Sequence, residues 1–541
     1  MTESHSDQKT DLHNSDYKIG QDNVQILGLD FHNPVFGISA LSIIAFVVLT
    51  LMFQEQASTM FTDLRKTLTT NLDWFFLLAG NIFVIFCLLL IVTPLGGIRL
   101  GGQDAKPDYS YLSWFAMLFA AGMGIGLMFF GVSEPMSHFD SALVGTTLEN
   151  GVRTDWTPLG GAVGDVDAAR NLGMAATLYH WAIHPWSIYA VVALALGFFA
   201  FNYKLPLTLR SAFYPLLGER VWGWPGHLVD ILAVFATLFG LATSLGFGTE
   251  QALAGFNFLF DTPTGDGARV LLISVITGMA LISVLRGLDG GVRVLSEINI
   301  GIAFLLLVFI FLVGPTSDII STTIAGSVAY MKDIIPLSMP FGREDANFSQ
   351  GWTAFYWAWW ISWSPFVGMF IAQVSRGRTI REFIVCVVLI PTIVTMIWMG
   401  TFGGTAIAQV IADADAAVKS APLELKMFQM FKELPLTGIT SFIGIVLVLV
   451  FFVTSSDSGS LVIDTITVGG KTDAPVAQRI FWAIFEGLVA ATLLLVGGAG
   501  ALTALQAMAV STGLPFTLVL LAMCISLLIG LNRVLKTLKK P

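Results

Sequence analysis

The stretch Ala121-Gly122-Met123-Gly124-Ile125-Gly126 interrupts an apolar run at 110–133 that is long enough to cross a bilayer. Glycine is about 1 kcal/mol less favourable than alanine in a helix, so three alternating glycines predict a helix that breaks within the membrane. Hydrocarbon offers no partner to the freed backbone groups, so such a break usually lines a cavity, where N–H groups face an anion and carbonyl groups a cation. Close helix packing is the alternative, because small residues often serve only that purpose in spans.

The rest of the chain is also apolar. Of its 541 residues, 55% are hydrophobic and only 12% charged, and the mean hydropathy is +0.77. Soluble domains carry about 25% charged residues, so a soluble multidomain enzyme, a disordered scaffold and a secreted disulfide framework are excluded. A further run at 317–335 predicts an amphipathic helix that does not span. Twelve runs have the length of a membrane span, at 35–54, 74–94, 110–133, 172–202, 228–258, 268–285, 298–314, 353–374, 383–408, 437–456, 478–498 and 510–531.

Charge sets the expected orientation. Most of the 28 lysines and arginines fall on the side that holds both termini, which predicts cytoplasmic termini. We therefore expect a cytoplasmic tail at 1–34, a membrane domain of twelve helices at 35–531 and a short basic cytoplasmic tail at 532–541. No cleaved signal peptide is visible, and the net charge of −9 argues against a nucleic-acid partner.

A second interruption is expected at Trp363-Ser364-Pro365, because proline removes one helical hydrogen bond and clashes with the preceding turn. It lies five spans after the glycine break. Two interrupted spans in corresponding places of two halves are a pointer to the central site of a transporter.

Aromatic residues concentrate in the fourth and eighth spans. Trp181, Trp186 and Tyr189 fall within one arc of a helix, and Trp359, Trp360 and Trp363 lie deep in the eighth span. Several such rings around one volume attract a quaternary ammonium, which cannot donate hydrogen bonds. A purely structural tryptophan cluster remains the alternative. Trp352 and Tyr356 are interpreted as anchors at the lipid headgroups, where these residue types gather.

Five segments together resemble the betaine/choline/carnitine transporter family. The match in span order covers nearly the whole chain beyond the N-terminal tail, and the eighth-span block is the most specific. The segments are Gly122 through Pro135, His180 through Tyr189, Trp357 through Gly368, Ser375 through Glu382, and Phe452 through Ser458.

The resemblance implies an all-α membrane protein with twelve helices. Spans 3–12 would form two inverted five-helix repeats of the LeuT-like kind, at about 110–314 and 353–531. It also implies a homotrimer in a bacterial inner membrane that imports an osmoprotective zwitterion or cation by alternating access. Choline-type members tend to carry an acid where this chain has Gly126. We therefore expect glycine betaine, or a relative such as dimethylsulfoniopropionate, rather than choline.

The resemblance also assigns residues. It implies substrate contacts from the aromatic box and the glycine segment: Trp181, Trp186, Tyr189, Trp360, Trp363, Gly122, Met123, Gly124 and Gly126. It implies that Trp359 and Phe355 line the route or gate.

Sodium is the expected coupling ion, and no other cofactor is expected. By resemblance, its ligands are the Thr454 and Ser455 hydroxyls with carbonyls of Ala120, Met123 and Phe451. Taken alone, such hydroxyls usually bond their own helix. The sodium-independent antiporters of the family carry an arginine on span five that is missing here. A second sodium site is doubtful: Thr237 matches one ligand, with Phe366 nearby, but Leu241 replaces the second threonine unless Thr243 or Ser244 substitutes.

Alternatives stay open. Intramembrane Glu250 and Glu486 are suspects by default, and proton-coupled choline uptake through Glu250, or sodium-independent antiport, is the second hypothesis. A channel would need rings of pore-lining groups. An enzyme is not expected, because His180 and His184 lack further ligands nearby in sequence.

Overall fold

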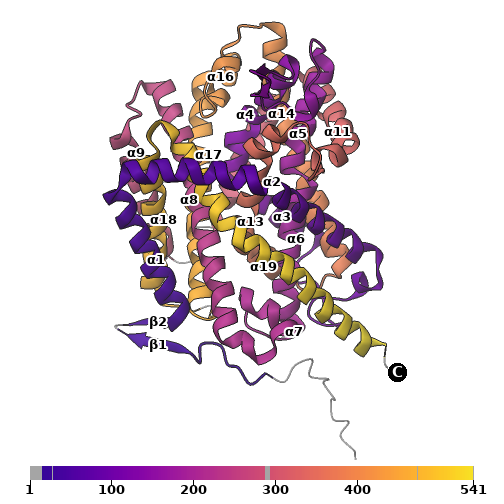
Figure 1. Ribbon diagram of the computed structural model, residues 1–541, viewed down its shortest axis with the longest axis vertical. Coiled ribbons are helices and arrows are strands. Elements are labelled where there is room, and N and C mark those ends of the chain that lie inside the picture. Colours follow the sequence, from indigo (N-terminus) through magenta and orange to yellow (C-terminus); the bar gives the residue numbers. More distant parts are fainter. Residues whose placement is uncertain (1–14, 27, 123, 287–292, 472, 540–541) are drawn as a thin grey trace, which may run out of the picture.

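The computed structural model describes residues 15–26, 28–122, 124–286, 293–471 and 473–539. These residues form a bundle of long helices with two small antiparallel hairpins (Figure 1). The hairpins are β1 (Asn23–Ile26) with β2 (Leu29–His32), and β3 (Leu148–Glu149) with β4 (Val152–Arg153). The all-α membrane class that the resemblance implies is confirmed.

The expected spans are all present as helices. Ten helical runs are long and apolar enough to cross a membrane within the described residues. The other two spans are the glycine-broken pair α3–α4 and α13, whose Trp and Tyr side chains reduce its hydropathy. In order the long helices are α1 (Asn33–Met52), α2 (Gln54–Val92), α3 (Tyr111–Gly122), α4 (Ile125–Val144), α5 (Val166–Trp181), α6 (Ile183–Phe201), α8 (Trp224–Phe260), α9 (Asp266–Arg286), α10 (Arg293–Val313), α11 (Thr316–Ser338), α13 (Ala354–Val374), α14 (Ile380–Ala412), α17 (Thr437–Thr467), α18 (Val476–Gly497) and α19 (Ala501–Leu538).

Several helices are longer than the apolar runs that predicted them. Helix α2 begins at Gln54, although the apolar run begins only at 74. Helix α19 (Ala501–Leu538) is longer than the apolar run at 510–531 at both of its ends. It crosses the bundle obliquely and ends near the C-terminus of the chain (Figure 1). Helix α11 occupies the place of the expected amphipathic helix.

Both ends of the described chain meet the same short segment, which comprises α7 (Tyr214–Leu217) and the 3-10 turn Gly218–Trp222. The Ser15 hydroxyl donates to Glu219 over 3.2 Å, and the Arg533 guanidinium donates to the Pro215 carbonyl over 3.3 Å. The two termini therefore lie at one end of the bundle, as the even number of spans requires.

The glycine break is confirmed. Helix α3 ends at Gly122 and α4 begins at Ile125, with Gly124 in an extended conformation (φ −167°, ψ −173°). Met123 lies outside the described residues.

The expected break at Pro365 is wrong, because α13 runs through this residue without interruption. Proline cannot donate to the carbonyl of Ile361. The Ser364 hydroxyl donates to that carbonyl instead, over 2.6 Å, so the helix keeps its hydrogen bond and continues.

A break that we did not expect divides the fourth span at Ala182 (φ −107°, ψ −118°), between α5 and α6. Pro185 lacks the N–H that would bond the carbonyl four residues earlier, at Trp181. The Ile183 N–H, freed by the bend, donates to the Tyr330 hydroxyl of α11 over 3.2 Å. Trp181 and Trp186 therefore belong to two different helices, on either side of a bend.

Candidate functional site

A cavity lies where the two helix breaks meet α13. It contains about 440 Å³ of space free of atoms, including the part that opens to solvent, and none of its lining residues is charged. Its lining comes from the start of α4, the α5–α6 bend, α8 and α13. The lining residues are Gly124, Ile125, Gly126, Leu127, Trp181, Tyr189, Ser244, Trp359, Trp360 and Trp363.

The four aromatic residues assigned to a box come together around Trp360. Its ring centroid lies 5.4 Å from that of Trp181, 6.1 Å from that of Trp186 and 5.0 Å from that of Tyr189. The ring planes are steeply inclined to one another, at 79°, 59° and 60°. Trp186 packs against Tyr189 behind the lining. Inclined rings of this kind can present several π-faces to one enclosed volume.

The indole N–H groups divide into two sets. Trp359 donates to the Ser244 hydroxyl over 3.1 Å and Trp363 to the Gly240 carbonyl over 2.9 Å, which fixes both side chains against α8. The buried N–H groups of Trp186 and Trp360 find no acceptor in the described part of the chain. Phe355, the other expected gate residue, stacks on Trp359 with centroids 5.5 Å apart. Among these four described indoles, only those of Trp186 and Trp360 therefore keep an N–H group free for an acceptor on a ligand.

Gly126 and Gly124 differ in their surroundings. A Cβ on Gly126 would lie 2.6 Å from the Trp181 ring and 3.1 Å from the Trp359 ring, whereas a Cβ on Gly124 would meet nothing within 4 Å. Gly126 therefore also serves close packing, the alternative reading of the glycine motif. Any larger side chain at this position, an acidic one included, would overlap these rings.

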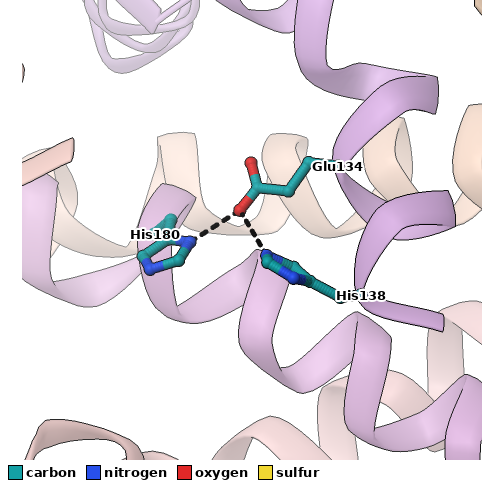
Figure 2. A group of neighbouring side chains, drawn as sticks. All are labelled: Glu134, His138 and His180. Carbon is teal, nitrogen blue, oxygen red and sulfur yellow. Dashed lines mark hydrogen bonds and ion pairs between the residues drawn. The ribbon is translucent and has the colours of Figure 1, made fainter. Parts of the chain in front are cut away.

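A polar centre behind the box escaped the sequence analysis. Glu134 of α4 is completely buried, and its Oε1 lies 2.6 Å from Nδ1 of His180 and 3.1 Å from Nε2 of His138 (Figure 2). Its Oε2 accepts hydrogen bonds from the Trp181 indole, over 2.6 Å, and from the Tyr356 hydroxyl. The sequence signal was a carboxylate and a histidine one helical turn apart, directly after the apolar run at 110–133.

Trp352 and Tyr356 are not anchors at the lipid surface, and that interpretation is wrong. Both are buried: Tyr356 stacks on the His180 ring at 4.6 Å, and Trp352 contacts the His138 ring edge-on at 4.7 Å. The polar Glu134 centre explains their burial, since the Tyr356 hydroxyl needs an acceptor inside the protein.

Of the expected sodium ligands, Ala120 lies on α3 and Phe451, Thr454 and Ser455 lie on α17, while Met123 is outside the described residues. The Thr454 hydroxyl donates to the carbonyls of Val450 and Phe451, over 3.0 and 3.1 Å. The Thr454 hydroxyl therefore donates its hydrogen to its own helix, as the alternative interpretation predicted. The lone pairs of its oxygen can still bind a cation. Ser455 and Ala120 are half-buried.

Helix α17 also approaches the start of α4. A Cβ on Gly248 would lie 3.2 Å from Ile125 and 3.4 Å from Val448, so both helices meet at this glycine of α8.

The residues named for a second sodium site serve other contacts. The buried Thr237 hydroxyl donates to the Ala233 carbonyl over 2.7 Å, and the Phe366 ring packs against Trp363. Leu241 fills the space over Gly459. Of the two substitute hydroxyls, that of Thr243 bonds two carbonyls, and that of Ser244 already accepts from Trp359.

The two suspected glutamates have different surroundings. Glu250 forms an ion pair with Arg269 at the start of α9, with 2.6 Å between Oε1 and Nε. Glu486 is buried on α18 and accepts one hydrogen bond, from the Ser456 hydroxyl over 2.9 Å. His184 stands apart from the Glu134 centre: its Nε2 lies 3.1 Å from the Asn81 amide oxygen.

Comparisons with known proteins identify the family of the chain. A sequence profile of the family "betaine/carnitine/choline family transporter" matches residues 34–535. Three relatives come from Vibrio parahaemolyticus. A glycine betaine/proline/choline transporter is 64% identical over 97% of this chain and 95% of its own. A glycine betaine transporter is 57% identical over 97% and 98%. A glycine betaine/proline/choline/ectoine transporter is 52% identical over 97% and 91%.

Proposed function

The chain belongs to the betaine/carnitine/choline transporter family, and from that premise we propose that it imports glycine betaine by sodium-coupled alternating access. It is a membrane transporter of small betaine-like solutes and not an enzyme. The particular solute, the coupling ion and the direction are the proposal, and each rests on a different part of the site.

The aromatic box is the single observation that carries the substrate assignment. The trimethylammonium group of glycine betaine cannot donate hydrogen bonds and is easily dehydrated, so an uncharged cage of π-faces suits it. Each desolvated cation–π contact contributes up to about 2 kcal/mol. Trp181, Tyr189 and Trp360 line the cavity without a charged neighbour in the lining. A cavity for an ordinary amine would need acceptors for its N–H groups.

The start of α4 suits the carboxylate end of the same molecule. The first N–H groups of a helix have no intrahelical partner and carry the positive end of the helix dipole. Gly124 through Leu127 line the cavity at this helix start, and the Trp360 N–H is a further donor with no protein acceptor in the described residues. A zwitterion can therefore place its two ends on the rings and on the helix start.

Sodium coupling rests on the hydroxyls of α17. Thr454 and Ser455 offer hard oxygen atoms two turns along α17 from Val448, where this helix approaches the start of α4. Of the five proposed ligands, the Phe451 carbonyl is the weakest, because it already accepts from the Thr454 hydroxyl. An ion between α3 and α17 would link the two helices and couple its own binding to that of the substrate.

The proposed setting follows the family and the charge distribution. We place the protein as a homotrimer in a bacterial inner membrane, with both termini cytoplasmic and with osmoprotection as its role. The termini share one end of the bundle, and the sequence predicts that most of the lysines and arginines fall on the side of the termini.

Uptake by proteoliposomes tests the proposal. Labelled glycine betaine is offered with an inward sodium gradient, a potassium control and empty liposomes. Unlabelled glycine betaine, carnitine, choline, proline and ectoine compete in parallel. We expect saturable uptake that needs sodium, with glycine betaine itself as the strongest competitor. Equal uptake in potassium would contradict sodium coupling, and no competition by any quaternary ammonium would contradict the substrate class.

Choline is the second candidate, because the box recognises a group that choline shares with glycine betaine. The helix start at α4 distinguishes them, since choline has no carboxylate. Stronger competition by choline than by glycine betaine would favour the second candidate. The proton-coupled variant loses support because Glu250, its expected carrier, is paired with Arg269.

A further inference from the structure

We propose that Glu134 is the buried counter-charge of the aromatic box and the residue that positions Trp181 and Tyr356. This inference rests on the proposed function, since it concerns how a quaternary ammonium is held. It assigns a role in specificity to a side chain that does not line the cavity.

Four donors surround the Glu134 carboxylate. The imidazoles of His138 and His180 point at Oε1, and the Trp181 indole and the Tyr356 hydroxyl donate to Oε2 (Figure 2 for the histidines). An ionised carboxylate only accepts hydrogen bonds, so four donors favour the ionised form. A tyrosine hydroxyl and an indole carry no charge to neutralise it. Neutral histidines would leave one negative charge inside the bundle.

The hydrogen-bond arrangement is compatible with a neutral His180. Nε2 of His180 lies 2.9 Å from the Thr353 hydroxyl, which can donate to it while Nδ1–H donates to Glu134. His180 then stays neutral with both ring nitrogens satisfied. Its ring is held between Tyr356 at 4.6 Å and Phe348 at 5.4 Å.

The carboxylate reaches the box through one ring. Trp181 presents its ring to Trp360 at 5.4 Å and donates its N–H to Glu134 at the edge of the same ring. Donation to an anion increases the electron density of the indole and so strengthens its attraction for a cation. The low dielectric of the interior keeps the direct attraction between the carboxylate and an ammonium strong. The cavity lining, which has no charged side chain, thus gains a negative charge from behind.

A metal ion is the competing occupant of this centre. The three ligand atoms of Glu134, His138 and His180 lie within 4.8 Å of one another, and all three residues are buried. Two features favour hydrogen bonds. Both ring nitrogens approach the same oxygen at hydrogen-bond distance, and the second carboxylate oxygen is occupied by Trp181 and Tyr356. A divalent ion would also replace the negative charge by a positive one, and so repel the ammonium.

The test compares a cationic ligand with an uncharged ligand of the same shape. Purified protein is titrated with choline and with its carbon analogue 3,3-dimethylbutan-1-ol, by competition against labelled glycine betaine. In Glu134→Gln we expect the affinity for choline to fall about tenfold, as for the loss of a remote charge in a low-dielectric interior. The affinity for the alcohol should fall much less. Equal losses for both ligands would mean that Glu134 only supports the fold of the box, and would overturn the counter-charge.

Glu486→Gln is the matched control. Glu486 is as deeply buried as Glu134 but accepts from Ser456 on α17, and no box residue touches its carboxylate. The ratio of choline to alcohol affinity should stay at the parent value in this variant. A parent protein that binds neither choline nor glycine betaine would overturn the proposed function itself, which is a different outcome from equal losses in Glu134→Gln.

A second pair of variants decides the matter if Glu134→Gln does not fold. Trp181→Phe removes the N–H that bonds Glu134, whereas Trp186→Phe removes an N–H without an acceptor in the described residues. We expect the larger loss of choline affinity in Trp181→Phe, and equal losses would contradict the proposal.

Elemental analysis of the purified protein tests the competing metal site. A stoichiometric metal that disappears in His138→Gln would overturn the proposal in favour of a metal site.

Discussion

Two regions of the bundle hold buried carboxylates in opposite ways. Behind the aromatic box, Glu134 has four donors around its two oxygens. Between α17 and α18, Glu486 has one, from Ser456, and Arg479 is 3.9 Å from Asp464, whose oxygens have no hydrogen-bond donor in the described residues. Both oxygens of the Glu134 carboxylate are therefore hydrogen-bonded, whereas one oxygen of Glu486 and both oxygens of Asp464 are not in the described residues.

We propose that this difference separates recognition of the solute from coupling to the ion. A satisfied network holds its members in one arrangement, which suits the wall of a binding site. Buried groups with missing partners carry a free-energy cost that another arrangement, a proton or a cation can relieve. We therefore expect substitutions near the box to change affinity for the solute, and substitutions on α17 to change the dependence on the ion.

The largest effect is expected from Gly126→Ala. Its Cβ would overlap the Trp181 and Trp359 rings, so Trp181 must move. Overpacking of this kind costs about 3 kcal/mol, which lowers the affinity for glycine betaine close to a hundredfold. Gly124→Ala is the control, since nothing lies within 4 Å of its Cβ and its extended backbone accepts any residue. Uptake of labelled glycine betaine measures both. Equal activity of the two variants would break the claim that the wall is rigid.

Trp360→Ala should weaken glycine betaine affinity by about 5–30-fold, because one cation–π face of about 1–2 kcal/mol is lost. Trp360→Phe should lose less, since a smaller ring remains. Binding to detergent-purified protein separates affinity from transport, and gel filtration confirms folding. Unchanged affinity in the alanine variant would mean that the rings are only structural.

The double substitution Thr454→Ala with Ser455→Ala tests the other region. It removes two of five proposed oxygen ligands, and we expect the sodium concentration for half-maximal uptake to rise about tenfold, within the usual range of coupling free energies. Substrate affinity should fall with it, because coupling between two sites is reciprocal. Alanine is a better helix former than serine or threonine, so folding should persist. An unchanged sodium dependence would remove these hydroxyls from the coupling site.

The smallest effect is expected from Glu250→Gln. The Glu250–Arg269 pair is partly exposed, and such pairs contribute about 0–1 kcal/mol, so sodium-driven uptake should stay within about twofold of the parent. Asp266→Asn is the matched control, because Asp266 bonds the same arginine over 2.9 Å. The proton-coupled alternative would be restored by two results together: a pH gradient drives uptake in the parent, and only Glu250→Gln abolishes that uptake.

The helices were predictable because lipid demands long apolar runs, and the break at Gly122–Gly124 was predictable because glycine is a poor helix former. The polar first half of α2 escaped, since an apolar run cannot reveal a helix at 54–73 that has a polar face. The two prolines were each interpreted wrongly: a break was expected at Pro365, where α13 continues, and none was expected at Pro185, where the fourth span bends. Ser364 replaces the hydrogen bond that Pro365 removes, whereas the bend before Pro185 is stabilised by Tyr330 from a distant helix.

The candidate site was predictable in its rings but not in its support. Trp181, Trp186, Tyr189 and Trp360 came from two segments that the family resemblance singled out, and the structure brings them together. The Glu134 centre needed the fold, because its donors come from α4, α5 and α13. Spacing along the chain reveals only His138, one turn away.

The central claim is that the cavity recognises a positive charge through aromatic faces. Calorimetric titration of the parent protein in sodium with glycine betaine and with its carbon analogue 3,3-dimethylbutanoate tests it most directly, since the two differ only in the charge of the bulky group. We predict at least about a tenfold preference for glycine betaine, the equivalent of about 1.4 kcal/mol and within reach of a single desolvated cation–π contact. Equal affinities would show that the box selects apolar volume, and would contradict the account.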